Sequence, residues 1–199
     1  QAIEDVQRYR DPPRRETFDN HTLILFRGLR EIKKDLTFKQ MTIALFAGDR
    51  CLISCHQRPS RGVTYFWEHA QPENLLVSPG LLASKIMRFS VGCYVDSILE
   101  FEPSLNELED SMHEKPDDDV MREVIAYKSR LRKLKRIFSY HERLVANLLK
   151  DIPQRLIDED GDIEHGLQDL FERCERLNSL CTMYFEICGD LINGYLSIT

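Results

Sequence analysis

The sequence lacks any apolar stretch long enough to cross a bilayer. Its longest apolar runs are 22–26 and 41–46, whereas a membrane-spanning helix needs about 20 consecutive apolar residues. The segment 1–15 is polar and charged, without the apolar centre of a signal peptide. We therefore expect no membrane span and no signal peptide within these 199 residues.

The sequence also lacks the motifs of common enzymes. It has only nine glycines, and no phosphate-binding glycine loop, HExxH pair or Ser/His/Asp set can be found in it. Acidic residues outnumber basic ones, 33 to 27, for a formal net charge of -6. The missing motifs lead us to expect that the protein is not an enzyme. Because binding to nucleic-acid phosphates needs a basic surface, we also do not expect a nucleic-acid-binding protein.

Six cysteines are too few and too scattered for a disulfide framework, so we expect reduced thiols in a cytosolic compartment. Cys174, Cys181 and Cys188 recur every seven residues, which separates neighbours by about 10.5 Å along a helix. One metal ion cannot bridge that distance with thiolate bonds of about 2.3 Å. We interpret these three as small apolar residues of a packed helix, and His141 as a buried histidine rather than a ligand.

Hydrophobic residues make up 42% and charged residues 30% of the chain, which is typical of a folded protein. The region before residue 78 alternates strand-like runs with turn signals. Strands are predicted at 21–28, 39–47 and 50–56, the last two joined as a hairpin by Gly48-Asp49. Short helices are predicted at 1–10 and 63–68.

The region after residue 78 reads as long helices. Ser78 is the expected cap of a helix that starts at Pro79 and continues to about Met112, either unbroken or kinked at Pro103. A second helix at 120–150 should complete an antiparallel hairpin with the first. We therefore predict an α+β protein with three parts: an α/β part at 1–77, a helical hairpin at 78–154 and a terminal helix within 155–199.

The terminal helix, expected from about residue 162 onward, has two contrasting faces. Nine apolar positions alternate spacings of three and four residues, which indicates a packed seam; they are Leu167, Leu170, Cys174, Leu177, Cys181, Tyr184, Cys188, Leu191 and Tyr195. Polar residues recur every seven positions on roughly the opposite face: Glu172, Ser179, Glu186 and Asn193. A solvated face is the simplest interpretation of this polar stripe.

Several short motifs, taken in order, resemble the CorA family of divalent-cation transporters. The resemblance starts with Ile3-Glu4-Asp5-Val6, Pro13-Arg14-Arg15-Glu16 and Phe18-Asp19-Asn20 before an apolar strand. It continues through the strand ending at His56, an acidic and a basic helix joined at Glu114-Lys115-Pro116, and the closing Gly194-Tyr195-Leu196-Ser197. These motifs extend over almost the whole chain.

The resemblance implies the cytoplasmic domain of a homopentameric channel at the cytoplasmic face of the cell inner membrane. The fold would be an α/β/α-layer domain with a partial sheet, a long helical hairpin and a stalk helix that leads to membrane helices. By the same resemblance, a regulatory Mg²⁺, with Co²⁺ or Zn²⁺ as alternatives, would lie between subunits on Glu4, Asp5 and Asp169. The polar stripe would then face the central funnel.

The sequence departs from the family pattern where members carry further acidic residues. Met87, Val91 and Gly92 stand on the first long helix, and Asn193 stands before the closing motif. The run Leu25-Phe26-Arg27-Gly28 is similar to a motif of the zinc-transporting ZntB branch. Two alternatives therefore stay open, a ZntB-type zinc transporter and a soluble helical scaffold without ion function.

Overall fold

A computed structural model describes residues 12–114, 117–157 and 161–198. The mixed α+β class predicted from the sequence is confirmed. In chain order the elements are β1 (Arg14–Thr17), β2 (Thr22–Ile32), β3 (Phe38–Ala47), β4 (Leu52–His56), α2 (Arg61–His69), η1 (Leu75–Val77), α3 (Pro79–Leu99), α4 (Phe101–Glu114), α5 (Asp118–Lys150), η2 (Gln154–Leu156) and α6 (Asp162–Ile198).

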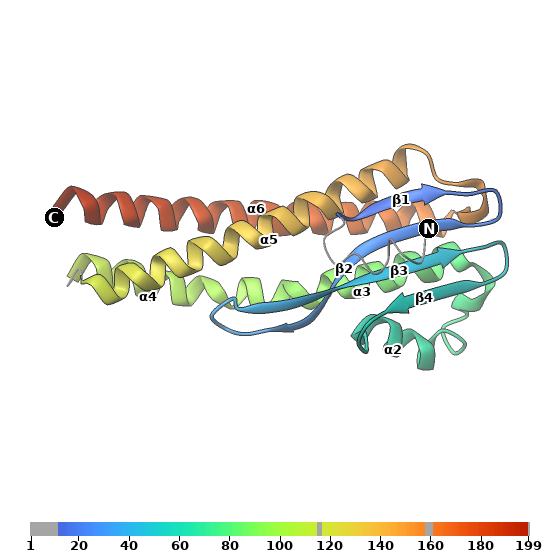
Figure 1. Ribbon diagram of the computed structural model, residues 1–199, viewed down its shortest axis with the longest axis horizontal. Helices are drawn as coiled ribbons and strands as arrows, with labels where there is room; N and C mark the ends of the chain where they lie inside the picture. The colour runs from blue at the N-terminus through green and yellow to red at the C-terminus, as the bar shows by residue number, and fades with distance from the viewer. Residues whose placement is uncertain (1–11, 115–116, 158–160, 199) are drawn as a thin grey trace.

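The four strands form an antiparallel sheet in the order β1-β2-β3-β4. The predicted β3–β4 hairpin is confirmed. Strand β2 is longer than predicted, because it pairs with β3 as far as Ile32↔Phe38, beyond a bulge between Leu29 and Glu31. Since β1 pairs with β2 only as far as Leu25, the far end of the β2–β3 hairpin projects alone along the helices (Figure 1).

Strand β1 was not among the predicted strands. Its sequence, Arg-Arg-Glu-Thr, is charged and has no hydrophobic alternation, so local pattern gives no strand signal. Contacts from far along the chain hold it instead. Arg15 donates to the carbonyl oxygen of Asp151 and pairs with its carboxylate at 3.1 Å, which attaches β1 to the end of α5.

The helix starts follow ordinary capping chemistry. As predicted, Ser78 caps α3 by accepting a hydrogen bond of 3.1 Å from the backbone N–H of Leu81, with Pro79 next to the cap. Asp117 caps α5 in the same way.

The break between α3 and α4 falls at Glu100 rather than at Pro103. Pro103 lies in the first turn of α4, where a missing backbone N–H breaks no helical hydrogen bond. The proline therefore marks the start of a helix and does not kink one.

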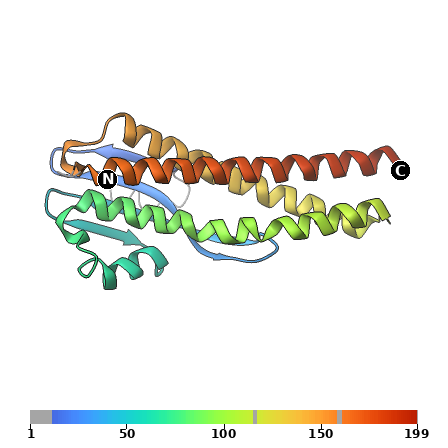
Figure 2. The same cartoon turned by 180° about the vertical axis from the view of Figure 1, so that it is seen from behind.

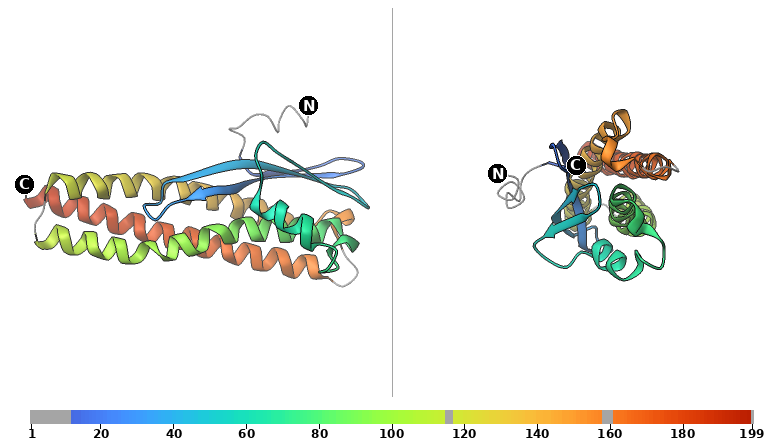
Figure 3. Two further views of the ribbon diagram at one scale, coloured as in Figure 1. Left: turned by 90° about the horizontal axis from the view of Figure 1, so that it is seen from below. Right: turned by 90° about the vertical axis from the view of Figure 1, so that its right-hand side faces the viewer.

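One face of the sheet packs on the helices (Figure 3). Ile24, Phe26, Ile43 and Leu45 point into a core that they share with α3, α5 and α6. Leu23, Leu25 and Ala44 form a smaller buried cluster on the other face. This separation follows from the two-residue period of a strand. The predicted helix at 1–10 lies outside the described residues.

The long helices form an extended bundle beside the sheet. Helix α6 has 37 residues, which corresponds to about 55 Å at 1.5 Å per residue. Eight of its nine predicted seam positions are buried, and Tyr195 is partly buried, so the seam is confirmed. Its C-terminal end lies beside the end of α4 and the start of α5, at the opposite end of the molecule from most of the sheet (Figures 1 and 2). Among the described residues, no helix combines the length and hydropathy of a membrane span.

Candidate functional site

Asp169 lies two turns into α6 and faces α3. Its Oδ2 atom is 2.5 Å from Nε of Arg88, and the two side chains are 47% and 41% exposed. An exposed ion pair of this kind contributes at most about 1 kcal/mol to stability. The carboxylate is therefore already partnered within the chain by the guanidinium of Arg88.

The Asp169–Arg88 pair lines a cleft of ≈890 Å³ between the start of α6, the start of α3 and the loops beside them. Four acidic side chains line it, Asp49, Glu73, Asp162 and Asp169, together with three basic ones, Lys85, Arg88 and Arg155. Arg155 lies 3.6 Å from Asp49. The charges thus largely offset one another. Within the described part of the chain, no three His, Cys, Asp or Glu residues come together as a metal site.

The other two predicted metal ligands, Glu4 and Asp5, lie outside the described residues. The positions where the family pattern has further acidic residues cannot replace them. Met87 and Val91 are each 2% exposed and belong to the core. A Cβ atom on Gly92 would lie 3.2 Å from a guanidinium nitrogen of Arg173, so this position faces α6 rather than open solvent.

All four residues of the polar stripe on α6 are exposed: Glu172, Ser179, Glu186 and Asn193. Glu172 accepts a hydrogen bond of 3.0 Å from Gln168, one turn earlier on the same helix. The stripe therefore presents two carboxylates and two neutral polar groups to the surroundings of this chain.

The three seam cysteines are fully buried. Burial raises the pKa of Cys174 and Cys181 to about 12 and that of Cys188 to about 11, because a thiolate is poorly solvated in an apolar core. A neutral thiol is a poor nucleophile and a poor metal ligand. These residues pack, as interpreted from their spacing.

His141 is buried on α5, and its Nε2 atom accepts a hydrogen bond of 3.0 Å from the backbone N–H of Arg27. Burial, with a smaller contribution from the Arg27 charge, lowers its pKa to about 3. The neutral imidazole thus joins α5 to the unpaired side of β2, which agrees with its interpretation as a buried histidine.

Sequence reasoning missed the basic partner of Asp169. Arg88 precedes Asp169 by 81 positions, and no local pattern connects the two residues. The run 25–28 also has a structural reason for its composition. A Cβ atom on Gly28 would come too close to Cδ1 of Ile43 on the neighbouring strand, so a larger residue there would require the Ile43 side chain to move.

The sequence of the whole chain, residues 1–199, matches the family model described as "CorA-like Mg2+ transporter protein". The chain belongs to this family. It is also 22% identical over 199 residues to "Putative metal ion transporter YfjQ" of Bacillus subtilis (strain 168), covering 99% of this chain and 60% of that protein. The chain thus spans about three fifths of the curated relative.

Solved structures share the fold. The soluble domain of CorA from Methanocaldococcus jannaschii superposes with a TM-score of 0.78 at 17% identity, covering 98% of this chain and 78% of that one. The complete CorA magnesium transporter from the same organism gives 0.79 at 16% identity, with 98% and 62% covered. The ZntB cytoplasmic domain from Vibrio parahaemolyticus RIMD 2210633 gives 0.72 at 15% identity, with 100% and 79% covered.

Proposed function

We propose that the chain is the cytoplasmic domain of a divalent-cation transporter and that it gates transport by sensing the cation. Membership of the CorA-like Mg²⁺ transporter family over the whole chain carries this proposal. In it, the domain works at the cytoplasmic face of the cell inner membrane, and α6 is the stalk that continues toward the membrane segment. Five copies assemble around a central axis, and their α6 helices make the contacts around it.

Asp169 would bind Mg²⁺ together with Glu4 and Asp5 of a neighbouring copy. One feature of the chain supports a shared site: the Asp169 side chain is 47% exposed in a single copy. Hard oxygen ligands suit Mg²⁺, which commonly keeps several of its waters and takes one or two carboxylates.

Gating follows from differential affinity. A cation bound between copies stabilises the assembled, symmetric state, and loss of the cation releases the subunits. Within one chain Arg88 is the competitor of the cation, because it pairs with the same carboxylate oxygen. Removing Arg88 should therefore strengthen cation binding, whereas neutralising Asp169 should weaken it.

The test is the Mg²⁺ dependence of thermal unfolding, measured with the chain at a concentration where it is oligomeric. The native chain should gain stability with Mg²⁺, Arg88→Gln should reach the same gain at lower Mg²⁺, and Asp169→Asn should lose it. A ligand at ten times its Kd adds about 1.4 kcal/mol to the free energy of unfolding. Asp96→Asn, an exposed aspartate of α3 outside the cleft, is the matched control. An unchanged Mg²⁺ response in Asp169→Asn would refute the site.

The polar stripe on α6 would line the funnel of the assembly. Glu172 and Glu186 would then form two carboxylate rings, which concentrate cations near the pore. In the complete transporter, Glu172→Gln with Glu186→Gln should slow uptake at low cation concentration more than at saturation. The control is Glu102→Gln with Glu107→Gln, which removes the same charge from exposed positions on α4. Equal effects of the two double variants would contradict the funnel.

Zinc transport is the second candidate, supported by the likeness to the ZntB cytoplasmic domain. Uptake of Mg²⁺, Co²⁺ and Zn²⁺ by the complete protein in liposomes separates these possibilities. In the remaining alternative, a soluble scaffold without ion function, none of these ions changes the stability of the chain and none is transported.

A further inference from the structure

A second hollow lies on the opposite side of α5 from α6, where the β2–β3 hairpin projects beyond β1. It is a groove of ≈1060 Å³ between this hairpin and the middle of α5. Its volume lies just above the range of small-molecule sites, about 300–1,000 Å³. It is separate from the cleft of Asp169, with which it shares no lining residue.

The groove gathers positive charge in a chain that is acidic as a whole. Six basic side chains line it, from two regions about 100 residues apart in sequence: Arg27, Arg30, Lys39, Arg130, Lys133 and Arg136. Among the described residues that line it, none is acidic. The chain has a formal net charge of -6, so this gathering of basic side chains runs against the average.

The α5 residues form one stripe. Arg130, Lys133 and Arg136 follow one another at intervals of three residues, which places them on the same side of a helix. The hairpin faces this stripe with Arg30 and Lys39. Like charges held this close repel one another, and a bound anion would relieve that repulsion.

Carboxylates form ion pairs with only some of the basic side chains that line the groove. Lys39 pairs with Glu31 at 3.2 Å, and Arg130 contacts Asp35 at 3.4 Å. Within the ranges that the structure describes, Arg30, Lys133 and Arg136 take part in no ion pair.

Arg27 anchors the floor of the groove. It is 7% exposed and donates a hydrogen bond of 2.5 Å to the hydroxyl of Thr42. The groove therefore contains one buried basic side chain, held in place by a hydrogen bond, in addition to its solvent-exposed cations.

Apolar and aromatic residues also line the groove. Phe38 at the start of β3, and Ile137 and Tyr140 on α5, lie among the basic groups. A ligand that combines phosphates with a flat ring matches this mixture, because guanidinium and ammonium groups bind phosphate and aromatic rings stack on bases.

We propose that this groove binds a soluble phosphorylated anion of nucleotide size, with two or more phosphates on Arg30, Lys133 and Arg136. Such a ligand contacts the β2–β3 hairpin and α5 at once, and so holds the projecting hairpin against the bundle. This goes beyond cation sensing at Asp169, since the ligand, its charge and the binding residues all differ.

Isothermal titration calorimetry of the 199-residue chain with ATP tests the proposal. EDTA in the buffer keeps divalent cations, and hence the Asp169 site, out of the measurement. Lys133→Glu with Arg136→Glu should weaken ATP binding about tenfold or more, since each lost charged hydrogen bond contributes about 1.5–3 kcal/mol. Arg132→Glu with Arg143→Glu is the matched control, with the same charge change at exposed α5 positions outside the groove. It should change the affinity by less than about threefold, the long-range part being screened.

Further titrants separate the contribution of the phosphates from that of the nucleoside, and a soluble phosphate from a lipid headgroup. Tripolyphosphate should bind more weakly than ATP at the same residues, and adenosine should not bind. Three results would overturn the proposal: no ATP binding at millimolar concentration, equal losses in the two double variants, or binding only to vesicles that contain phosphatidylglycerol. Circular dichroism and thermal unfolding of both variants ensure that the comparison is between folded chains.

Discussion

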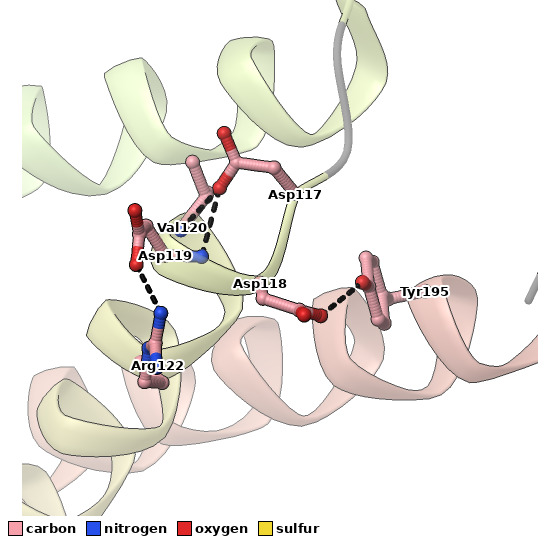
Figure 4. A network of polar contacts seen from close by, with 6 residues as sticks. All are labelled: Asp117, Asp118, Asp119, Val120, Arg122 and Tyr195. Carbon is pink, nitrogen blue, oxygen red and sulfur yellow. Dashed lines mark hydrogen bonds and ion pairs between the residues drawn. The ribbon is translucent and has the colours of Figure 1, made fainter.

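The hydroxyl of Tyr195 donates a hydrogen bond of 2.8 Å to Oδ1 of Asp118, and so joins the last turns of α6 to the first turn of α5 (Figure 4). In the sequence, Asp118 lies between two other aspartates that make different contacts. Asp117 caps α5 through the backbone N–H groups of Asp119 and Val120, and Asp119 pairs with Arg122. In the proposed transporter, this contact would hold the stalk to the hairpin near the membrane.

Removing this hydroxyl should loosen the end of α6. In Tyr195→Phe, we expect faster amide hydrogen exchange in the final turns of α6 and unchanged exchange at the buried positions Leu167, Leu170, Cys174 and Leu177. Tyr140→Phe, which also removes a tyrosine hydroxyl, is the control and should leave these turns unchanged. Uniform acceleration over the whole helix would contradict a local role.

The same contact should appear in the alkaline titration. The hydrogen bond to Asp118 raises the pKa of the Tyr195 phenol above its ordinary value of 10. A raised pKa in the folded state means that the contact is present below pH 10 and is lost as the pH rises through the folded pKa. Ultraviolet absorbance of tyrosinate should therefore show one phenol whose pKa falls in Asp118→Asn.

Acid should destabilise the chain through His141. The pKa of this buried imidazole is about 3 in the folded state and about 6.5 when unfolded. Below pH 6.5 the unfolded chain binds a proton that the folded chain does not, so stability falls with the pH until about pH 3. The loss is about 1.4 kcal/mol for each pH unit below the unfolded pKa.

Urea unfolding at pH 7 and pH 5 measures this effect. The native chain should lose about 2 kcal/mol more between these two pH values than His141→Gln, since 1.5 units lie below the unfolded pKa. His113→Gln, at an exposed histidine on α4, should keep the full loss. If His141→Gln loses as much as the native chain, the imidazole does not carry the acid sensitivity.

Two glycines on helices should respond in opposite ways to a methyl group. A Cβ on Gly80 would lie 2.8 Å from the backbone Cα of Leu156, where α3 meets η2. Gly80→Ala should cost about 1–3 kcal/mol of unfolding free energy by overpacking. A Cβ on Gly194 meets nothing within 4 Å, so Gly194→Ala should be neutral or stabilise by up to about 1 kcal/mol. Chemical denaturation of both variants measures these changes. Similar changes in the free energy of unfolding for the two variants would contradict this packing.

Thiol reactivity should divide the six free cysteines by position. Cys51 is exposed, whereas Cys174, Cys181 and Cys188 are buried with strongly raised pKa values. With Ellman's reagent at pH 8, Cys51 should react fast and the three seam thiols only on unfolding. Cys51→Ser should remove the fast phase. A fast phase that survives in Cys51→Ser and disappears in Cys181→Ser would show that the seam opens in the native state.

The elements with a strong periodic pattern could be read from the sequence. The α6 seam repeats apolar residues at helical spacing over nine positions, so local periodicity was enough to predict its burial. The caps at Ser78 and the hairpin turn at Gly48-Asp49 depend on neighbouring residues only. The family, too, could be identified from short motifs and their order.

Strand β1 and the break at Glu100 could not be predicted in the same way. Arg14–Thr17 has no alternation, and its pairing with β2 and its attachment to Asp151 are long-range contacts. The basic run of α5 was visible, but the hairpin that encloses a groove with it was not. The reason is that a groove requires two surfaces that are distant in sequence.

The sequence alone determined the long helices, the β3–β4 hairpin, the buried seam of α6 and the family, because each depends on the order of neighbouring residues. Only the tertiary structure decided that Arg88 forms an ion pair with Asp169 and that Tyr195 donates a hydrogen bond to Asp118. It also gathered the cations of β2, β3 and α5 around one groove. The physical reason is that charge pairing and cavities depend on distances in space between side chains, and chain folding sets those distances across separations of many residues.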